Sequence, residues 1–283
     1  MVGRETAEYV QGLDKFDVFG YDISERALRS TSLHSASSVW DMLPPCEFYI
    51  VCVNTWWRNE SPDMSAVIDV CQRVAKTSPG SLVSIESTLA VGTSRMISKL
   101  LNLDIIHVPH RLWPENMEEH GVRQTRVFGA VDEKSKARGV DFYDRLDIPL
   151  VKLDRIESAE FVKLVENSYR YVQLAFTEEI AVLCESVGLT FPEIKKGVNS
   201  KWNAELFEPR DGIGGTCLPK DIRFLKSMIQ SLPLIEGALR TDDTYRLLVS
   251  PNKERHHITQ IEIPIVSVED FQQLVVPLND TAD

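Results

Sequence analysis

A single cysteine lies in a glycine-rich stretch, DGIGGTCLPKD, which runs from Asp211 to Asp221. Glycines beside a thiol let a planar substrate and a cofactor approach the backbone closely, and a neighbouring cation favours the thiolate. An accessible thiolate can attack an aldehyde or acyl carbon and hold it covalently. The stretch also fits a tight turn in which Cys217 is a small buried residue and Asp221 caps a helix, so these residues alone leave two interpretations open.

A lysine and an asparagine lie four residues apart in a long periodic segment, at positions Lys163 and Asn167. Residues with this spacing share one face of a helix. An ammonium group and an amide held together can stabilise an oxyanion or position a water molecule. The alternative is a polar stripe that faces solvent, which is the simpler interpretation of a single Lys/Asn pair.

Three histidines, His107, His110 and His120, raise the question of a metal site. Their spacing is loose and no cysteine pair joins them, whereas zinc sites use closely spaced ligands. The sequence therefore favours structural or substrate-facing histidines, and we predict no metal.

Composition sets broad limits on the kind of protein. The chain has 283 residues, 43% of them hydrophobic, which is enough for the core of one large or two ordinary domains. No signal peptide and no apolar run of membrane-spanning length is found, so we expect a cytoplasmic protein. A net charge of −11 argues against nucleic acid as a partner. The five cysteines lack the spacing of a disulfide framework and are expected to be reduced.

Short apolar runs alternate with helical patterns over the first 154 residues. This rhythm predicts βαβ units and a parallel sheet, with helices at 64–78 and 92–102. The predicted strands lie at 16–22, 46–53, 81–88, 104–110, 126–132 and 149–154.

One long helix is predicted from Glu157 to Val187, because the segment is periodic and contains neither glycine nor proline. We place the domain boundary just before it, giving an α/β domain at 1–155, a helical domain at 156–250 and an unassigned tail at 251–283. The tail contains one strand-like run, IEIPIVSV.

A nucleotide site is suggested by GYDIS, which places Asp22 at the end of a predicted strand. In a dinucleotide-binding βαβ unit, such an acid accepts hydrogen bonds from the ribose, roughly 20 residues beyond the glycine fingerprint. Gly3 takes the place of the third glycine, while the first two glycines and the first strand are missing. We therefore expect further residues upstream. Alone, the two positions fit a generic α/β turn equally well.

Taken together, these segments resemble the nucleotide-sugar dehydrogenases of the UDP-glucose/GDP-mannose dehydrogenase family. The matching motifs follow in order and cover roughly Gly3 to Arg246: GYDIS, CVNT, ESTLAVGT, PHRLWPE, AEFVKLVENSYRYVQLAFTEEIAVLCESVGL and GIGGTCLPKD. The resemblance implies a Rossmann-like sheet domain followed by a helical domain like that of 6-phosphogluconate dehydrogenase. It also implies a role in polysaccharide biosynthesis, by oxidation of the C6 alcohol of a UDP-sugar to a carboxylate with two NAD. UDP-N-acetylmannosamine and UDP-glucose are the substrates it suggests.

The resemblance also assigns roles to single residues. It makes Cys217 the nucleophile, Lys163 and Asn167 the oxyanion-stabilising and water-holding pair, and Asp221 the carboxylate that assists proton transfer. The cofactor-binding residues that it implies are Gly3, Asp22, Arg26, Val53, Asn54, Thr55 and Thr88, with Thr88 also near the catalytic water. The substrate-binding residues that it implies are His110, Arg111, Lys163, Asn167 and Gly214.

The chain departs from the family pattern in three places. His110 stands where the family has a glutamate, only about 35 residues follow Leu248 where a nucleotide-binding domain is usual, and the first strand is missing. A non-catalytic remnant that acts as an oligomerisation or regulatory module is therefore the alternative. A simpler β-hydroxyacid dehydrogenase is disfavoured, because forming a ketone needs no thiol. The long helix is apolar on more than one face, and the family's equivalent forms a dimer core, so we expect a homodimer.

Overall fold

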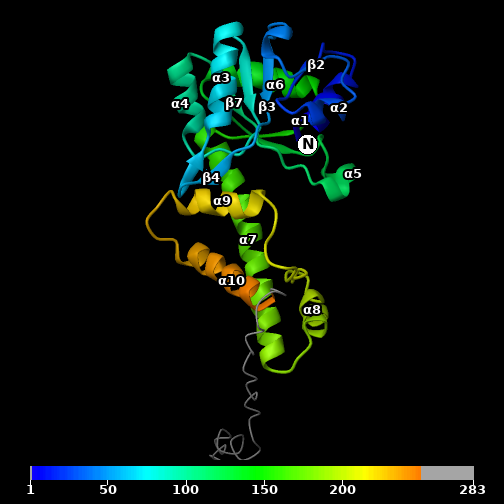
Figure 1. The fold of residues 1–283 in the computed structure, drawn as a ribbon, viewed down its shortest axis with the longest axis vertical. Coiled ribbons are helices and arrows are strands. Elements are labelled where there is room, and N and C mark those ends of the chain that lie inside the picture. Colours follow the sequence, from blue (N-terminus) through cyan, green and yellow to red (C-terminus); the bar gives the residue numbers. More distant parts are fainter. Residues whose placement is uncertain (1, 250–283) are drawn as a thin grey trace, which may run out of the picture. The chain divides into compact units, whose positions relative to one another are not determined.

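A computed structural model describes residues 2–249 (Figure 1). The strand-like run IEIPIVSV lies outside the described residues. The described chain forms two compact units. The sheet unit comprises residues 2–171 and 215–236, and the helical unit comprises 172–214 and 237–249. The predicted domain boundary at residue 155 stays a prediction, because the units divide within the long helix.

The sheet unit is built on a five-stranded sheet in the order β3-β6-β7-β8-β9. Its strands are β3 (Phe48–Val51), β6 (Leu82–Ile85), β7 (Asp104–His107), β8 (Arg126–Ala130) and β9 (Leu150–Lys152). All four residues of β6 are buried, as expected of a central strand covered on both faces. The predicted α/β class is confirmed.

The predicted parallel sheet is found at three of the four strand pairings, and the fourth pairing, between β7 and β8, is antiparallel. β3, β6 and β7 run parallel, but β8 pairs antiparallel with β7, and β9 is parallel to β8. A parallel pair needs a long crossover connection, usually a helix packed on the sheet. Between β7 and β8 the chain forms only η2 (Pro114–Asn116) and α5 (Met117–His120), and it returns along the neighbouring strand in the opposite direction.

Two hydrophobic cores cover the two faces of this sheet. On one face, α3 (Ser65–Thr77) and α4 (Thr93–Leu101) pack against Val83 and Ile85. On the other face, α1 (Val2–Gln11) and α6 (Glu133–Arg145) pack against Leu82 and Ile106. Neighbouring strand residues point to opposite faces, so one apolar run serves both cores. The helices predicted at 64–78 and 92–102 are confirmed as α3 and α4 (Figure 1).

Two short strand pairs stand apart from the main sheet. β1 (Gly20–Tyr21) and β2 (Ala36–Ser37) form a parallel pair that does not join β3. α2 (Glu25–Arg29) and η1 (Trp40–Met42) lie in the same part of the chain. The second pair is a hairpin of β4 (Trp56–Arg58) and β5 (Ser61–Asp63), which the sequence did not predict.

The long helix α7 (Ile156–Ser186) agrees with its predicted span to within one residue at each end. It is followed by α8 (Phe191–Asn199), α9 (Cys217–Lys226) and α10 (Pro233–Val249). Gly188 takes a positive φ of 71° just after α7, and Leu189 N–H donates to the Cys184 carbonyl over 2.9 Å. This is a common way of ending a helix. Among residues 2–249, no helix combines the length and apolar character that a membrane span requires.

Candidate active site

Three loops that carry predicted site residues follow the carboxyl ends of parallel strands. Val53, Asn54 and Thr55 follow β3, Thr88 follows β6, and His110 follows β7. Because the carboxyl ends of parallel strands meet at one edge of the sheet, these loops lie together, where open α/β sheets bind their ligands. The Thr55 hydroxyl donates to the Thr88 carbonyl over 2.8 Å, which joins two of the loops directly.

Cys217 is the first residue of α9, and its side chain is exposed. The alternative of a small buried cysteine is therefore wrong. Gly215, two residues before it, has a φ of 80° with no atom near its missing Cβ, so backbone conformation is what favours glycine there. Asp221 does not cap the helix either, because it lies inside α9. The local chain presents the thiol at a helix N-terminus, where a negative charge is stabilised.

Asp221 is fully buried and is the centre of a polar cluster in the sheet unit. Asn167 Nδ2 of α7 donates to Asp221 Oδ2 over 2.5 Å, and Lys220 Nζ donates to Asp221 Oδ1 over 2.5 Å. A buried carboxylate needs such donors, since an unpaired buried charge is costly. The predicted residues Asn167 and Asp221, which are 54 positions apart, are thus brought into direct contact.

Lys163 lies one turn before Asn167 on α7 and is partly buried. Burial lowers the pKa of its ammonium group, while Asp221, Glu166 and Cys217 raise this pKa and Arg111 lowers it. The ammonium group is therefore close enough to both Cys217 and Asp221 for their charges to act on it. Asn167 and Asp221 are in direct contact, Lys163 lies one turn away on α7, and Cys217 begins the helix that carries Asp221.

Lys220 belongs to this cluster and was missed by the sequence prediction. Its ammonium donates to Asp221, lies 3.2 Å from Thr55 Oγ1 and sits 4.6 Å above the Phe224 ring. Lys220 and Thr55 therefore connect Asp221 to the loop that carries Thr88. Its place in LPKD beside Asp221 was the available signal, but nothing local shows that a lysine will be buried.

His110 lies in a buried network beside this cluster. Its Nδ1 accepts from Leu112 N–H over 2.9 Å, and its Nε2 lies 3.1 Å from Arg126 Nη2 and 3.3 Å from Thr6 Oγ1. The pKa of His110 is lowered to about 4, chiefly by burial and also by Arg126, while Glu86 acts to raise it. A role as base or substrate ligand, which stays a prediction, requires these ring nitrogens to exchange partners.

Other predicted residues lie at the border of the cluster or elsewhere. Arg111 forms an ion pair with Glu166 of α7 and donates to the Thr125 carbonyl over 3.0 Å. Gly214 belongs to the helical unit. Burial lowers the pKa of His107 to about 3, which makes it a neutral core side chain. Within the described part of the chain, no three His, Cys, Asp or Glu side chains are arranged to hold a metal ion.

The predicted cofactor residues at the start of the chain lie on α1, β1 and α2. A Cβ at Gly3 would come within 3.0 Å of Cys52 Cβ, so α1 packs tightly on the end of β3. This close packing is the role of the third glycine in a dinucleotide fingerprint. Asp22 is exposed after β1, and one of its carboxylate oxygens accepts from Ser24 N–H over 2.8 Å. Arg26 is exposed on α2.

Comparison with known proteins identifies two domains of one family in the chain. Residues 20–147 match the NAD binding domain, and residues 157–243 the central domain, of the UDP-glucose/GDP-mannose dehydrogenase family. Two similar relatives are named UDP-N-acetyl-D-mannosamine dehydrogenase. The one from Methanocaldococcus jannaschii is 26% identical over 276 residues, covering 88% of this chain and 64% of the relative. The one from Pyrococcus horikoshii is 32% identical over 190 residues, covering 63% and 46%.

A solved structure of UDP-D-ManNAc dehydrogenase from Pyrococcus horikoshii is also similar, with a TM-score of 0.77 and 26% identity. The match covers 86% of this chain and 66% of that one. The chain spans between about half and two thirds of the length of the curated relatives, with shares of 64%, 46% and 52% for three of them. The two family matches account for most of the chain and include both α7 and α9. The chain belongs to the UDP-glucose/GDP-mannose dehydrogenase family.

Proposed function

We propose that the protein is an NAD-dependent nucleotide-sugar 6-dehydrogenase that oxidises the C6 alcohol of a UDP-sugar to the uronate through a thioester on Cys217. The observation that carries this proposal is the exposed thiol of Cys217 in one cluster with Lys163, Asn167 and Asp221. A scaffold needs no exposed thiol beside a buried ammonium group. A two-electron oxidation to a ketone needs none either.

Cys217 would act on the aldehyde that results from the first oxidation. Its sulfur adds to the C6 carbon, the thiol proton passes to the carbonyl oxygen, and a thiohemiacetal forms. Removal of two electrons and two protons leaves a thioester. Water then adds to the thioester carbon, the carbon–sulfur bond breaks, and the proton returns to sulfur. The products are the carboxylic acid and free Cys217.

The neighbouring polar groups suit the charges that develop during these steps. Each tetrahedral intermediate carries negative charge on oxygen, which the Lys163 ammonium and the Asn167 amide can stabilise. Asp221 accepts from Asn167 and Lys220 and so holds the amide in place. Its carboxylate, with Thr88, would orient the water that hydrolyses the thioester.

The residues present fit NAD at the edge of the sheet. Gly3 allows the close packing of α1. The exposed Asp22 carboxylate has an oxygen that can accept a hydrogen bond from a ribose hydroxyl. Val53, Asn54, Thr55 and Thr88 would line the same edge. When bound, NAD supplies the oxidant for each of the two oxidation steps.

The substrate that we propose first is UDP-N-acetyl-D-mannosamine. Two similar relatives and one similar solved structure are named as dehydrogenases of this compound. UDP-glucose is the second choice. Either product would place the enzyme in polysaccharide biosynthesis. We also propose a homodimer that forms through α7.

The Cys217→Ser variant tests the covalent scheme. A serine hydroxyl is a poor nucleophile at neutral pH without a base, so acid formation should fall by at least about a thousandfold while the fold is kept. NADH formation with a panel of UDP-sugars gives the rate, and intact mass spectrometry of the wild type detects the trapped thioester. Unchanged turnover in the serine variant rules the scheme out.

A non-catalytic role in oligomerisation or regulation is the second candidate. The observation that favours it is the separate β1–β2 pair, which leaves Asp22 on strands that do not join β3 among the described residues. The two candidates differ in ligand binding. A wild-type protein that binds neither NAD nor any UDP-sugar in calorimetry supports the non-catalytic role.

A further inference from the structure

Glu160 of α7 is a fully buried acid with no role in the chemistry described above. Both of its carboxylate oxygens accept hydrogen bonds from the backbone of another element. Gly92 N–H donates to Oε2 over 2.6 Å, and Ser94 N–H donates to Oε1 over 2.8 Å. Burial raises the pKa of Glu160, while these two backbone donors lower it.

The two N–H groups belong to the start of α4, which has no side-chain cap of its own. The first N–H groups of a helix lack intrahelical partners and are usually satisfied by a side chain at the N-cap. Here the N-cap residue is Gly92, with a φ of 92°, which cannot supply one. A carboxylate also interacts favourably with the positive end of the helix dipole. Glu160 therefore caps α4 from a different helix.

The capped end of α4 is also the end of the loop that carries Thr88. At the other end of this loop, Thr55 donates to the Thr88 carbonyl over 2.8 Å. Between the two, the Leu89 side chain is fully buried in the core. The loop is thus fixed at several places, which include a hydrogen bond from the Ser87 hydroxyl to the Val53 carbonyl over 2.7 Å. Glu160 is the attachment that comes from the helix carrying the candidate catalytic pair.

The spacing along α7 relates Glu160 to that pair. Lys163 is three residues later and Asn167 is seven residues later, which is about two helical turns, so all three share one face. A slip of one residue would move this face by about 1.5 Å along the axis and rotate it by about 100°. Two hydrogen bonds from one carboxylate to a fixed helix end oppose such a movement.

We propose that Glu160 is a positioning residue, whose carboxylate holds the Thr88 loop in register with Lys163 and Asn167. This inference rests on the proposed function, in which Thr88 and the Lys163–Asn167 pair act on the same intermediate. It assigns to Glu160 no contact with the reacting atoms.

A second acid on the same helix provides a matched control. Glu157 lies one turn before Glu160 and forms an ion pair with Arg95 of α4, and Arg95 Nη1 donates to the Val131 carbonyl over 3.2 Å. This pair also attaches α4 to α7, but it touches neither the Thr88 loop nor the first turn's N–H groups. Replacing Glu157 therefore tests only the attachment of α4 to α7. Replacing Glu160 also tests the position of the Thr88 loop.

The test compares Glu160→Gln with Glu157→Gln in the full chain. The glutamine has the same shape as glutamate but keeps only one acceptor and turns an amide donor toward the second N–H. Hydrogen exchange measured by mass spectrometry should accelerate at least about tenfold in the peptide spanning Thr88 to Arg95 for Glu160→Gln. With a UDP-sugar that the wild type oxidises, kcat should fall by about ten- to a hundredfold while KM changes less than about threefold. Glu157→Gln should leave both readouts close to those of the wild type.

The inference would be overturned if folded Glu160→Gln had the hydrogen-exchange rate and kcat of the wild type. It would also be overturned if Glu160→Gln and Glu157→Gln changed both readouts equally. If the glutamine variant does not fold, Glu160→Asp, which keeps the charge but shortens its reach, should show the same changes, and wild-type behaviour there overturns it. The exchange measurement needs no turnover. A wild type that oxidises no nucleotide sugar therefore refutes the proposed function separately, while the exchange result still decides whether Glu160 holds the loop.

Discussion

Asp221 organises the candidate site, because it is the group on which donors from two helices converge. An isolated aspartate in a protein interior would be costly. Here the Lys220 ammonium balances the charge, and the Asn167 amide donates a hydrogen bond to the second carboxylate oxygen. In turn, the buried carboxylate fixes the positions of the Asn167 amide and of the turn of α9 that carries Lys220. Those positions bring the exposed Cys217 close to groups that can stabilise an oxyanion.

Asp22 governs the cofactor preference that we expect. Its exposed carboxylate would repel the 2'-phosphate of NADP, and it would accept hydrogen bonds from the ribose hydroxyls of NAD. Asp22→Asn should reduce the ratio of the NADP to the NAD dissociation constant by at least about tenfold, since opposed like charges cost several kcal/mol. Fluorescence titration with each cofactor measures the ratio, and Glu25→Gln, a change at a nearby exposed acid, is the control. Equal binding of NAD and NADP to the wild type contradicts this assignment.

At the scale of elements, a buried ion pair joins two strands of the five-stranded sheet. Arg126 Nη1 of β8 donates to Glu86 Oε1 over 2.6 Å at the end of β6, and the Tyr143 hydroxyl of α6 donates to the same oxygen over 2.8 Å. Both charged side chains are fully enclosed. The pair therefore ties the antiparallel strand β8 to the strand that leads into the Thr88 loop.

Removing one partner of this pair should destabilise the fold strongly. Arg126→Met leaves the Glu86 carboxylate buried without its counter-charge, and the expected loss in the free energy of unfolding is about 3–5 kcal/mol. The double variant Glu86→Gln/Arg126→Met should recover a large part of that loss, because no uncompensated charge is left. Urea unfolding followed by tryptophan fluorescence measures both. A loss below about 1 kcal/mol in the single variant would show that the pair contributes little.

In the helical unit, α7 and α10 bring two acids together. Glu178 is almost fully buried, and its Oε2 has no hydrogen-bond partner among the described residues. The pKa of Glu178 is raised to about 7, chiefly by burial and also by Asp242, while Arg246 acts to lower it. In the folded state the protonated carboxyl is therefore favoured relative to the unfolded chain.

The sign of the pH dependence follows from this raised pKa. Below the unfolded value of 4.5 the group is neutral in both states. As the pH rises from 4.5 to about 7, the unfolded chain loses this proton while the folded protein keeps it, so the free energy of unfolding falls until the pH passes about 7. The loss between pH 5 and pH 8 should be at most about 3 kcal/mol. Glu178→Gln should remove this part of the dependence, so that the variant gains stability relative to the wild type at pH 8 but not at pH 5. Parallel pH profiles of urea unfolding would contradict the prediction.

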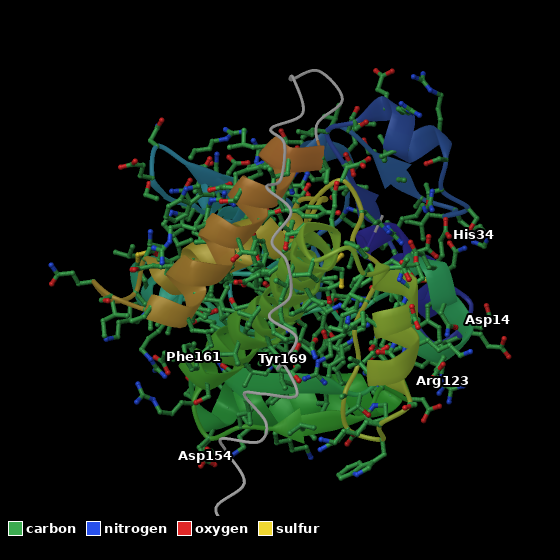
Figure 2. All side chains as sticks on the ribbon, turned by 90° about the horizontal axis from the view of Figure 1, so that it is seen from below. Asp14, His34, Arg123, Asp154, Phe161 and Tyr169 are labelled. Carbon is green, nitrogen blue, oxygen red and sulfur yellow. The ribbon has the colours of Figure 1, made fainter. Side chains whose placement is uncertain are left out.

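At the scale of the whole molecule, α7 carries three large side chains that are only partly buried. Phe161, Val165 and Tyr169 are 43%, 41% and 65% exposed and follow one another at intervals of four residues. Figure 2 labels Phe161 and Tyr169. Four-residue spacing places these side chains in one stripe, and an apolar stripe on a soluble protein favours association with a matching surface.

Sedimentation equilibrium at micromolar concentration should show a homodimer. Val165→Lys places a charge in the stripe and should shift the equilibrium toward monomer by at least about tenfold in dissociation constant. Leu100→Lys is the control, because Leu100 of α4 is 74% exposed and lies outside the stripe. A strictly monomeric wild type means that α7 is not the dimer core.

Sequence periodicity predicted the strands of the main sheet and three of the helices. Buried strands such as β6 and the helices α3, α4 and α7 follow from local apolar patterns, because each element must hide its own apolar face. The hairpin of β4 and β5 was missed for the same reason. Its sequence is polar after Trp56 and Trp57, and its turn holds Asn59 and Glu60 at positive φ values of 50° and 56°, which no apolar pattern signals.

The sequence by itself indicated the α/β class, the family and the candidate site residues Cys217, Lys163, Asn167 and Asp221. Only the tertiary structure decided that β8 runs antiparallel to β7, because strand direction depends on the path of a connection rather than on periodicity. It also decided that Lys220 is buried against Asp221 and that Glu160 caps α4. Both contacts satisfy charges that burial would otherwise make costly, and Glu160 meets backbone groups about 66 residues away along the chain. Packing between distant segments decides which partner balances a buried charge. The local sequence therefore does not predict that partner.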